Sequence, residues 1–284
     1  MPQKPGRIES QMSSCAICLE TNKDDNNTTL MIKLQIIFLL SLSFLFSSCT
    51  DKEDPPILEI RDLLDSAHIG ESIEKAKAHA EQSGKTDQIH YLRGWIQYLR
   101  KDDDQAEKEY KLCLKENPDS YDCQRGIGLI QQQRKQYAKA ESNFQKALNA
   151  AEAQKDFEAV SILRVDSGNL LLRQNRRSEA ISEYKKALEA KQDGSAYFGL
   201  GLTTLLQGDR KSSKDYLEKG LKTPYRDLIL KAETYYLLAK LQFEWEKNPR
   251  AAAVSAKKAF ELFPAKKEYA KAWEQYSKAA SSLP

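Results

Sequence analysis

The residues of this chain that could carry chemistry are few and poorly grouped. Its three histidines, His68, His79 and His90, follow one another at intervals of 11 residues. Imidazole is a common metal ligand, but turns are expected between these positions and no carboxylate motif accompanies them, so we do not expect a metal site. The chain also has no glycine-rich phosphate loop and no nucleophile elbow. The sequence therefore predicts neither an enzyme nor a cofactor.

Two short clusters have simpler explanations than ligand binding. Asp102, Asp103 and Asp104 could hold a cation weakly, but a turn that caps the next helix explains them better. Cys15 and Cys18 have the CxxC spacing of some metal and redox sites. No second CxxC or nearby histidine partners them, and they lie in a segment that we expect to be missing from the native product.

Cys113 and Cys123 are the cysteines of the expected folded part. Cys113 lies at a position that calls for a small core residue, which favours a buried free thiol. Export to an oxidising compartment would instead allow a disulfide between the two. The sequence leaves both alternatives open.

The composition favours helices. The chain has 284 residues, with only 12 Gly and 9 Pro, and is rich in Ala, Glu, Lys, Leu and Gln, which lose little rotamer freedom in a helix. Its 44 basic and 41 acidic residues are interspersed and give a net charge of +3. A nucleic-acid binder usually shows a basic stripe, which we do not find. We expect an all-α protein with a mixed surface and no nucleic-acid partner.

An export signal is expected before the folded part. Met31-Ile32-Lys33 is followed by an apolar run of 13 residues, Leu34 to Phe46. A basic start, an apolar stretch and small residues before a cleavage point are typical of a signal peptide. A spanning helix needs about 20 apolar residues, so a permanent membrane span is not expected. We interpret 31–48 as the signal peptide and Met31 as the native start, with residues 1–30 arising from a misplaced start codon.

The end of this signal, Phe46-Ser47-Ser48-Cys49, resembles the lipoprotein signal of bacteria. In that family the cysteine is lipidated and becomes the first residue after cleavage, which implies Cys49 as the lipid attachment site. The family usually has Leu where this chain has Phe46, and cleavage by an ordinary signal peptidase is the alternative. Residues 49–56 suit a short tether. The resemblance implies a bacterial lipoprotein anchored in a membrane, on the periplasmic side or at the outer membrane.

Four landmark positions recur along the rest of the chain: a small residue, a second small residue, an aromatic or large apolar residue, and a third small residue. Successive steps of 34, 40, 33 and 39 residues keep them in register. The five sets are Gly94, Ala106, Tyr110 and Cys113; Gly128, Ala140, Phe144 and Ala147; Gly168, Ala180, Tyr184 and Ala187; Gly201, Ser213, Leu217 and Gly220; and Lys240, Ala252, Ala256 and Ala259.

This spacing resembles the tetratricopeptide repeat family, whose A-x3-F element is matched by Ala180 and Tyr184. The resemblance implies an α-α superhelix of about five helix-turn-helix units, each stable only when stacked on its neighbours. We expect units at 87–120, 121–160, 161–193, 194–232 and 233–264. The segment around 151–160 reads as a helical extension at the exit of the second unit. Residues 57–86 are expected to form an N-terminal cap or degenerate repeat, and 265–284 a C-terminal capping helix.

In this family the first helix of each unit lines the concave face, where a protein or peptide binds. Projected onto this chain, the same geometry also places on the concave face the residues Gln132, Val165, Leu172, Leu237 and Leu241. A Lys/Asn/Arg clamp for a C-terminal carboxylate is not expected, because Tyr91 and Trp95 stand where it would begin. For the aromatic residues of the first unit, the alternative is that they only pack against the adjacent helix. The candidate binding residues are Tyr91, Trp95, Tyr98, Arg125, Leu129, Asn169, Phe198, Leu202, Leu205 and Trp245.

The sequence thus predicts a membrane-anchored adaptor or assembly scaffold that binds a protein or peptide and takes no small-molecule substrate. The alternative is a structural spacer of the cell envelope that associates with itself.

Overall fold

The structure is a computed structural model that describes residues 74–75, 78, 82, 86–225 and 227–282. The chain divides into two units, 1–52 and 53–284, and all of the described residues belong to the second. The predicted signal peptide, Cys49, the tether and most of the N-terminal cap, with His68 and His79, lie outside the described residues. The described part contains eleven helices and no strand, which confirms the all-α prediction. None of its helices is long and apolar enough to cross a membrane.

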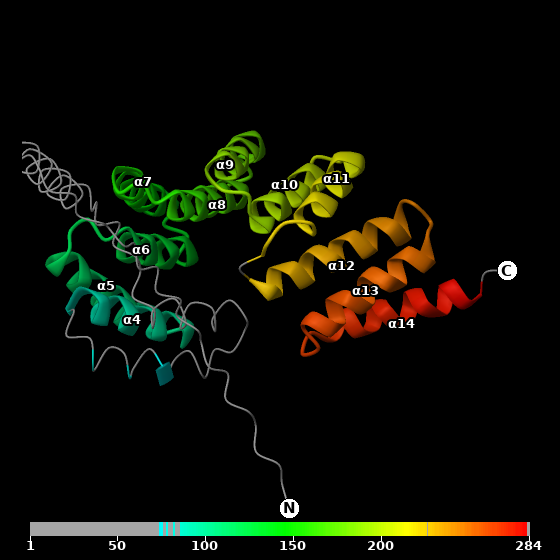
Figure 1. Cartoon of the computed structure of the whole chain (residues 1–284), viewed down its shortest axis with the longest axis horizontal. Coiled ribbons are helices and arrows are strands. Elements are labelled where there is room, and N and C mark those ends of the chain that lie inside the picture. Colours follow the sequence, from blue (N-terminus) through cyan, green and yellow to red (C-terminus); the bar gives the residue numbers. More distant parts are fainter. Residues whose placement is uncertain (1–73, 76–77, 79–81, 83–85, 226, 283–284) are drawn as a thin grey trace, which may run out of the picture. The chain divides into compact units, whose positions relative to one another are not determined.

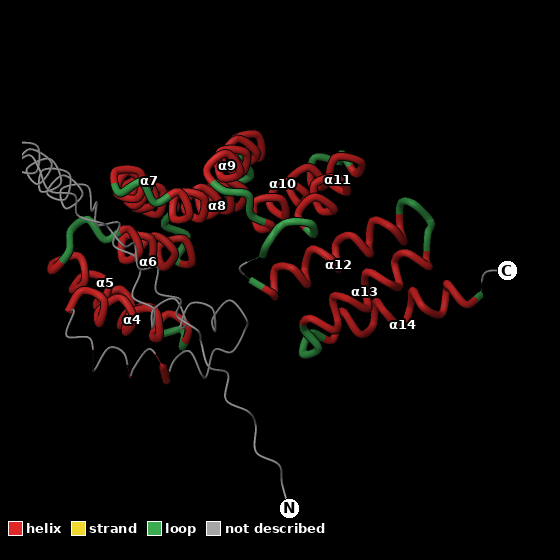
Figure 2. The backbone as a smooth tube through the Cα atoms, in the orientation of Figure 1, coloured by secondary structure: helices red, strands yellow, loops and turns green. Residues whose placement is uncertain are grey.

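Ten helices form five successive pairs of a first and a second helix, labelled as in Figure 1. Figure 2 shows that short loops join them. An eleventh helix, α14 (Lys267–Ser281), packs on the last pair. The pairs are α4 (Thr86–Leu99) with α5 (Asp103–Glu116), α6 (Tyr121–Gln133) with α7 (Tyr137–Ala153), α8 (Phe157–Arg173) with α9 (Arg177–Ala190), α10 (Gly194–Leu206) with α11 (Arg210–Gly220), and α12 (Leu228–Glu244) with α13 (Pro249–Leu262).

The turn inside each pair contains one residue with a positive φ. Gly208 adopts its positive φ of 89° at no steric cost, because it has no Cβ. The other four turns use Lys101, Lys135, Asn175 and Lys247. The first residue after such a turn often caps the second helix. Asp102 accepts from the backbone N–H of Gln105, which supports the capping explanation of the aspartate cluster.

The two long steps of the repeat come from extra helical turns. α7 and α8 each have 17 residues, against 14 in α5 and α9. The expected helical extension at 151–160 is confirmed only as far as Ala153, because a turn at 154–156 divides this segment and α8 starts at Phe157. Lys155 adopts φ of 57°, and Asp156 caps α8. α12 likewise begins at Leu228, before the predicted unit start at residue 233, because Asp227 caps it there.

The core of the repeats is built around rings that lie against glycines. Tyr110 of α5 lies between Gly94 of its own first helix and Gly126 of the next one, at opposite edges of the ring. A Cβ at these glycines would come within 2.6 and 2.5 Å of the ring. Tyr184 of α9 also lies between two such glycines, Gly168 of α8 and Gly199 of α10, which both approach the same Cδ1–Cε1 edge of its ring. Both tyrosines are fully buried, so one side chain holds three helices together.

Other residues take this role in the remaining pairs. Phe144 lies against Gly128, and Leu217 lies against Gly201. The fifth pair has Ala256 at the ring position, and Tyr276 of α14 completes its core cluster. α14 thus buries apolar surface that a sixth pair would otherwise cover.

We predict that Gly199→Ala destabilises the array, because its Cβ would lie 2.4 Å from the Tyr184 ring. Overpacking of this kind costs about 1–3 kcal/mol, more than the helix propensity of alanine returns. Urea unfolding followed by circular dichroism measures the change. Ser182→Ala, at an exposed position of α9, is the control and should change little. A Gly199→Ala midpoint equal to that of the control contradicts the prediction.

Candidate binding face of the first helices

The first helices α4, α6, α8, α10 and α12 form a continuous layer. Each packs on its own second helix, and each also contacts the first helix of the next pair. Each second helix packs in turn on the first helix that follows it. The residues predicted to bind a partner all lie on this layer. Two groups of them lie near its ends, one on α4 and one on α10 and α12, and the two groups have different surroundings.

At the α4 end, aromatic residues pack closely with one another. The rings of Trp95 and Tyr98 stack with centroids 5.5 Å apart, and the ring of Tyr91 lies 6.5 Å from that of Tyr110. Tyr91 and Tyr98 pack on the core cluster of α5 and α6. Burial raises the pKa of the Tyr98 hydroxyl, so it stays neutral. The packing role considered from the sequence is therefore real for Tyr91 and Tyr98, while both side chains remain only half-buried.

Arg125 of α6 is already paired within the fold. Its Nε lies 2.5 Å from a carboxylate oxygen of Asp166 on α8, and Asp166 is only 8% exposed. Burial by itself lowers the pKa of Arg125, but the Asp166 carboxylate outweighs it and raises that pKa above its ordinary value. The charge of Arg125 is thus largely compensated within the fold, which is in line with the expectation that this face has no clamp for a C-terminal carboxylate.

The sequence reasoning missed Asp166. It stands two residues before Gly168, where α6 and α10 have Gly126 and Gly199 before their own landmark glycines. A carboxylate at a position that otherwise holds a small core residue is a signal that could have revealed the pair. Asn169, another predicted binding residue, accepts a hydrogen bond from the Tyr184 hydroxyl at 2.8 Å, so its amide oxygen also has a partner within the fold.

At the other end, a pocket of about 430 Å³ is lined by residues of α12 and the turn after it, together with one residue each from α10 and the start of α11. Leu205 and Trp245, both predicted to bind, line it together with Leu237 and Leu241. Phe198 packs beside it on the cluster of Leu217, Leu238 and Leu241, and Leu202 is half-buried on the same helix, as Leu129 is on α6. The pocket also has a charged rim that the sequence reasoning did not identify: Arg210, Lys240, Glu244 and Lys247.

Family models for the tetratricopeptide repeat match residues 87–120 and 123–193. Residues 87–120 and 123–193 are therefore tetratricopeptide repeats. No curated protein shows significant sequence similarity to it. Members of this family are generally non-enzymatic scaffolds that bind proteins.

Solved structures share the fold at low sequence identity. The APC/C hetero-tetramer Cut9–Hcn1 is 13% identical with a TM-score of 0.64, over 90% of this chain and 49% of that one. The chain thus spans about half the length of that relative. PilW, a type IV pilus biogenesis factor, is 20% identical with a TM-score of 0.55, over 76% and 96%. The Rap conjugation regulator of plasmid pLS20, solved with its Phr* peptide, is 16% identical with a TM-score of 0.55, over 69% and 59%.

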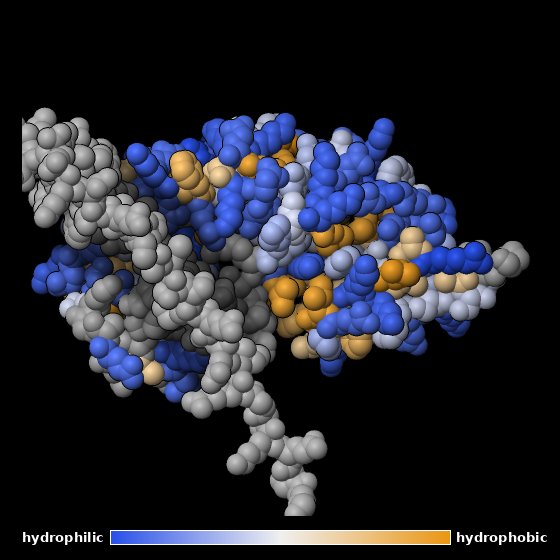
Figure 3. Space-filling model, in the orientation of Figure 1, coloured by the Kyte–Doolittle hydropathy of each residue, from blue (hydrophilic) through white to orange (hydrophobic). Residues whose placement is uncertain are grey.

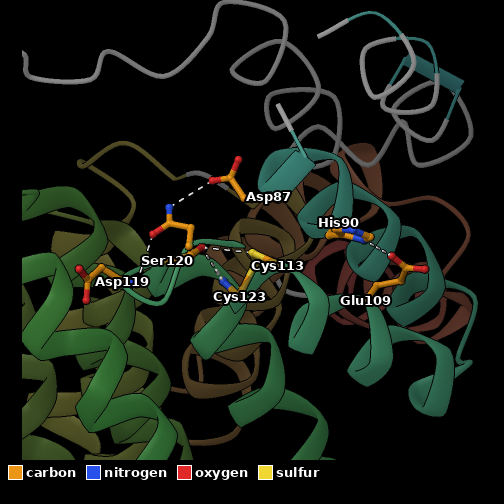
Figure 4. The surroundings of a disulfide bond; sticks show 8 residues. Asp87, His90, Glu109, Cys113, Asp119, Ser120 and Cys123 are labelled. Carbon is orange, nitrogen blue, oxygen red and sulfur yellow. Dashed lines mark hydrogen bonds and ion pairs between the residues drawn. A yellow bond between two sulfur atoms is a disulfide. The ribbon is translucent and has the colours of Figure 1, made fainter. Parts of the chain in front are cut away.

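Cys113 and Cys123, the cysteines of the repeats, form a disulfide (Figure 4), so the favoured expectation of a free thiol is wrong. Cys113 ends the core stripe of α5, and Cys123 lies in the first turn of α6. The short loop between the helices brings their Cα atoms to 6.4 Å, within the range of a disulfide. Figure 4 also shows His90 facing Glu109. The Nδ1 atom of His90 lies 2.7 Å from a carboxylate oxygen of Glu109. Among the described residues no cluster suited to a metal is present.

We predict that peptide mapping of the unreduced protein recovers Cys113 and Cys123 in one linked pair of peptides. Reduction should lower the free energy of unfolding by about 2–3 kcal/mol, because the bridge closes a short loop. The Cys113→Ala/Cys123→Ala variant, which has no bridge, serves as control and should not respond to reductant. Recovery of the two cysteines as separate free thiols contradicts the prediction.

Proposed function

We propose that this chain is a lipid-anchored adaptor of the bacterial cell envelope, which binds a protein or peptide partner along the face of its first helices. The observation that carries this proposal is the continuous layer of these helices with partly exposed apolar side chains along it. Leu129, Leu202 and Trp245 come from three different pairs and remain accessible in part. A face whose only role was to fill the core would bury such residues.

Two of the similar structures are compatible with this role. One is a pilus biogenesis factor, and another holds a peptide. Both are too distant in sequence to carry their partners over to this chain. They support the idea that a stack of such pairs is a suitable platform for an extended polypeptide.

The location in the envelope is supported by two independent features. The lipoprotein-type signal that ends at Cys49 is one. The Cys113–Cys123 disulfide is the other, because such bonds persist in oxidising compartments such as the periplasm and are rare in the cytosol. A protein that stayed in the cytosol would be expected to keep these thiols reduced.

The binding role is tested by photo-crosslinking in native membranes. A photoreactive amino acid is placed at Leu129 or Leu202 on first helices, and at Val254 on the second helix α13, which is 57% exposed. We expect the two first-helix positions to yield a shared set of partner proteins that the Val254 position does not. Crosslinks only to another copy of the chain would support the self-associating spacer and overturn the adaptor.

The anchor is tested separately through the processing of Cys49. We expect globomycin, an inhibitor of lipoprotein signal cleavage, to cause the uncleaved precursor to accumulate in the membrane fraction. Cys49→Ala should have the same effect, whereas Cys15→Ala, upstream of the expected start, should have none. Normal maturation of the Cys49→Ala protein would show that an ordinary signal peptidase cleaves it.

A further inference from the structure

We infer that the pocket between α10 and α12 binds an acidic peptide segment that carries a large apolar side chain. The inference rests on the proposed function, because it names the chemistry of the partner at one end of the first-helix face. Three observations carry it: the floor of the pocket, its unpaired cations, and the positions in the repeat from which these cations come.

The floor of the pocket is apolar and rigidly supported. Leu205 and Leu237 are half-buried and rest on the core cluster of Leu217, Leu238 and Leu241. Trp245 ends α12 at the edge of the pocket and is 39% exposed. Figure 3 shows hydrophobic patches between hydrophilic residues over the α10–α13 part of the surface. An exposed indole beside supported leucines is the usual setting of an interface anchor.

The rim of the pocket has an excess of positive charge. Arg210, Lys240 and Lys247 line it, with Glu244 as the single acidic residue. Within the described residues, none of these three cations forms an ion pair. The adjacent Lys214 behaves differently, because it pairs with Glu246 at 2.5 Å and with Glu218 at 3.6 Å. Glu218 and Glu246 near the pocket are thus paired with Lys214, and Glu244 alone does not balance the three cations of the rim. An acidic partner would supply the missing counter-charges.

Packing does not require a cation at either Lys240 or Arg210. Lys240 occupies the landmark position that holds glycine in the first four pairs, and the fifth pair has only Ala256 at the ring position, so no ring demands a small residue there. Arg210 is the first residue of α11 and follows Asp209, whose carboxylate caps the helix by accepting from the backbone N–H of Ser212. A cation at this end of a helix is unfavourable because of the helix dipole. Its position adds to the positive potential of the pocket.

The size of the pocket points to a peptide segment. A volume of about 430 Å³ lies in the range of about 300–1,000 Å³ that holds small ligands, so it accommodates a few side chains and not a folded domain. A nucleic acid would need a longer basic track than three residues. The expected ligand is therefore a short polypeptide that has carboxylates on either side of Leu, Phe or a similar residue.

The test is selection from a random 12-residue peptide library displayed on phage, with the purified full-length chain as bait. We expect the enriched peptides to be net acidic and to contain a large apolar residue. Synthetic copies labelled with fluorescein should bind at least tenfold more weakly to Arg210→Glu/Lys240→Glu. Their affinity should also fall as NaCl is raised from 50 to 500 mM, because exposed charges are screened.

Lys271→Glu, an exposed position of α14 outside the pocket, is the matched charge control and should change binding less than twofold. Trp245→Ser tests the apolar contribution and should weaken binding about as much, with circular dichroism showing that the helices are retained. No enrichment, enrichment of neutral or basic peptides, or acidic peptides that ignore the pocket variants overturns the inference. If the peptide test fails but Leu129 and Leu202 crosslink to partner proteins, the proposed function stands and only this inference is lost. If acidic peptides are selected but neither position crosslinks to a partner, the proposed adaptor function is lost instead.

Discussion

The fold depends on one recurring contact, in which a bulky side chain of a second helix is inserted against glycines of two successive first helices. Tyr110 makes it with Gly94 and Gly126, and Tyr184 makes it with Gly168 and Gly199. The ring can occupy that space only because the glycines at these two positions have no Cβ. Since one glycine belongs to the ring's own pair and the other to the next pair, the same contact closes a pair and stacks it on its neighbour. Formation of a unit and its association with the next are therefore physically coupled.

This contact also determines which residues remain for a binding surface. The ring fills the space between its own helix and the first helices, so the first-helix positions that face it must hold small residues. Only the opposite side of the first helices is then free to vary in residue type. Where a first helix lacks one of these glycines, a charged residue can take its position in the layer of first helices. Asp166 stands at a position that holds glycine in α6 and α10, and it is stabilised there by Arg125. Lys240 stands at a landmark glycine position, in the pair that has Ala256 instead of a ring.

Much of the architecture could be predicted from the sequence because this contact constrains residue types at fixed intervals. Landmarks such as Ala106, Tyr110 and Ala180 were found from spacing alone and are fully buried. The second glycine of each contact was not found, because Gly126 and Gly199 recur in only two units and Asp166 or an apolar residue replaces them elsewhere. The turn at 154–156 was missed for a related reason: Lys155 adopts a left-handed conformation without being Gly or Asn.

The candidate site was less predictable than the fold, because its properties depend on pairs of residues and not on single positions. The family pattern places Arg125 and Lys240 on the same layer, but only their neighbours decide what each can do. Arg125 meets a carboxylate 41 residues away in the chain, and its charge is used within the fold. Lys240 has Lys247 and Arg210 around it, with one glutamate among them. A periodic pattern specifies which helix faces approach each other. The pattern does not specify the charged residues outside the landmark positions, and these decide whether a charge on the face is compensated. The two ends of one continuous face can therefore differ in the charge of the partner that they attract.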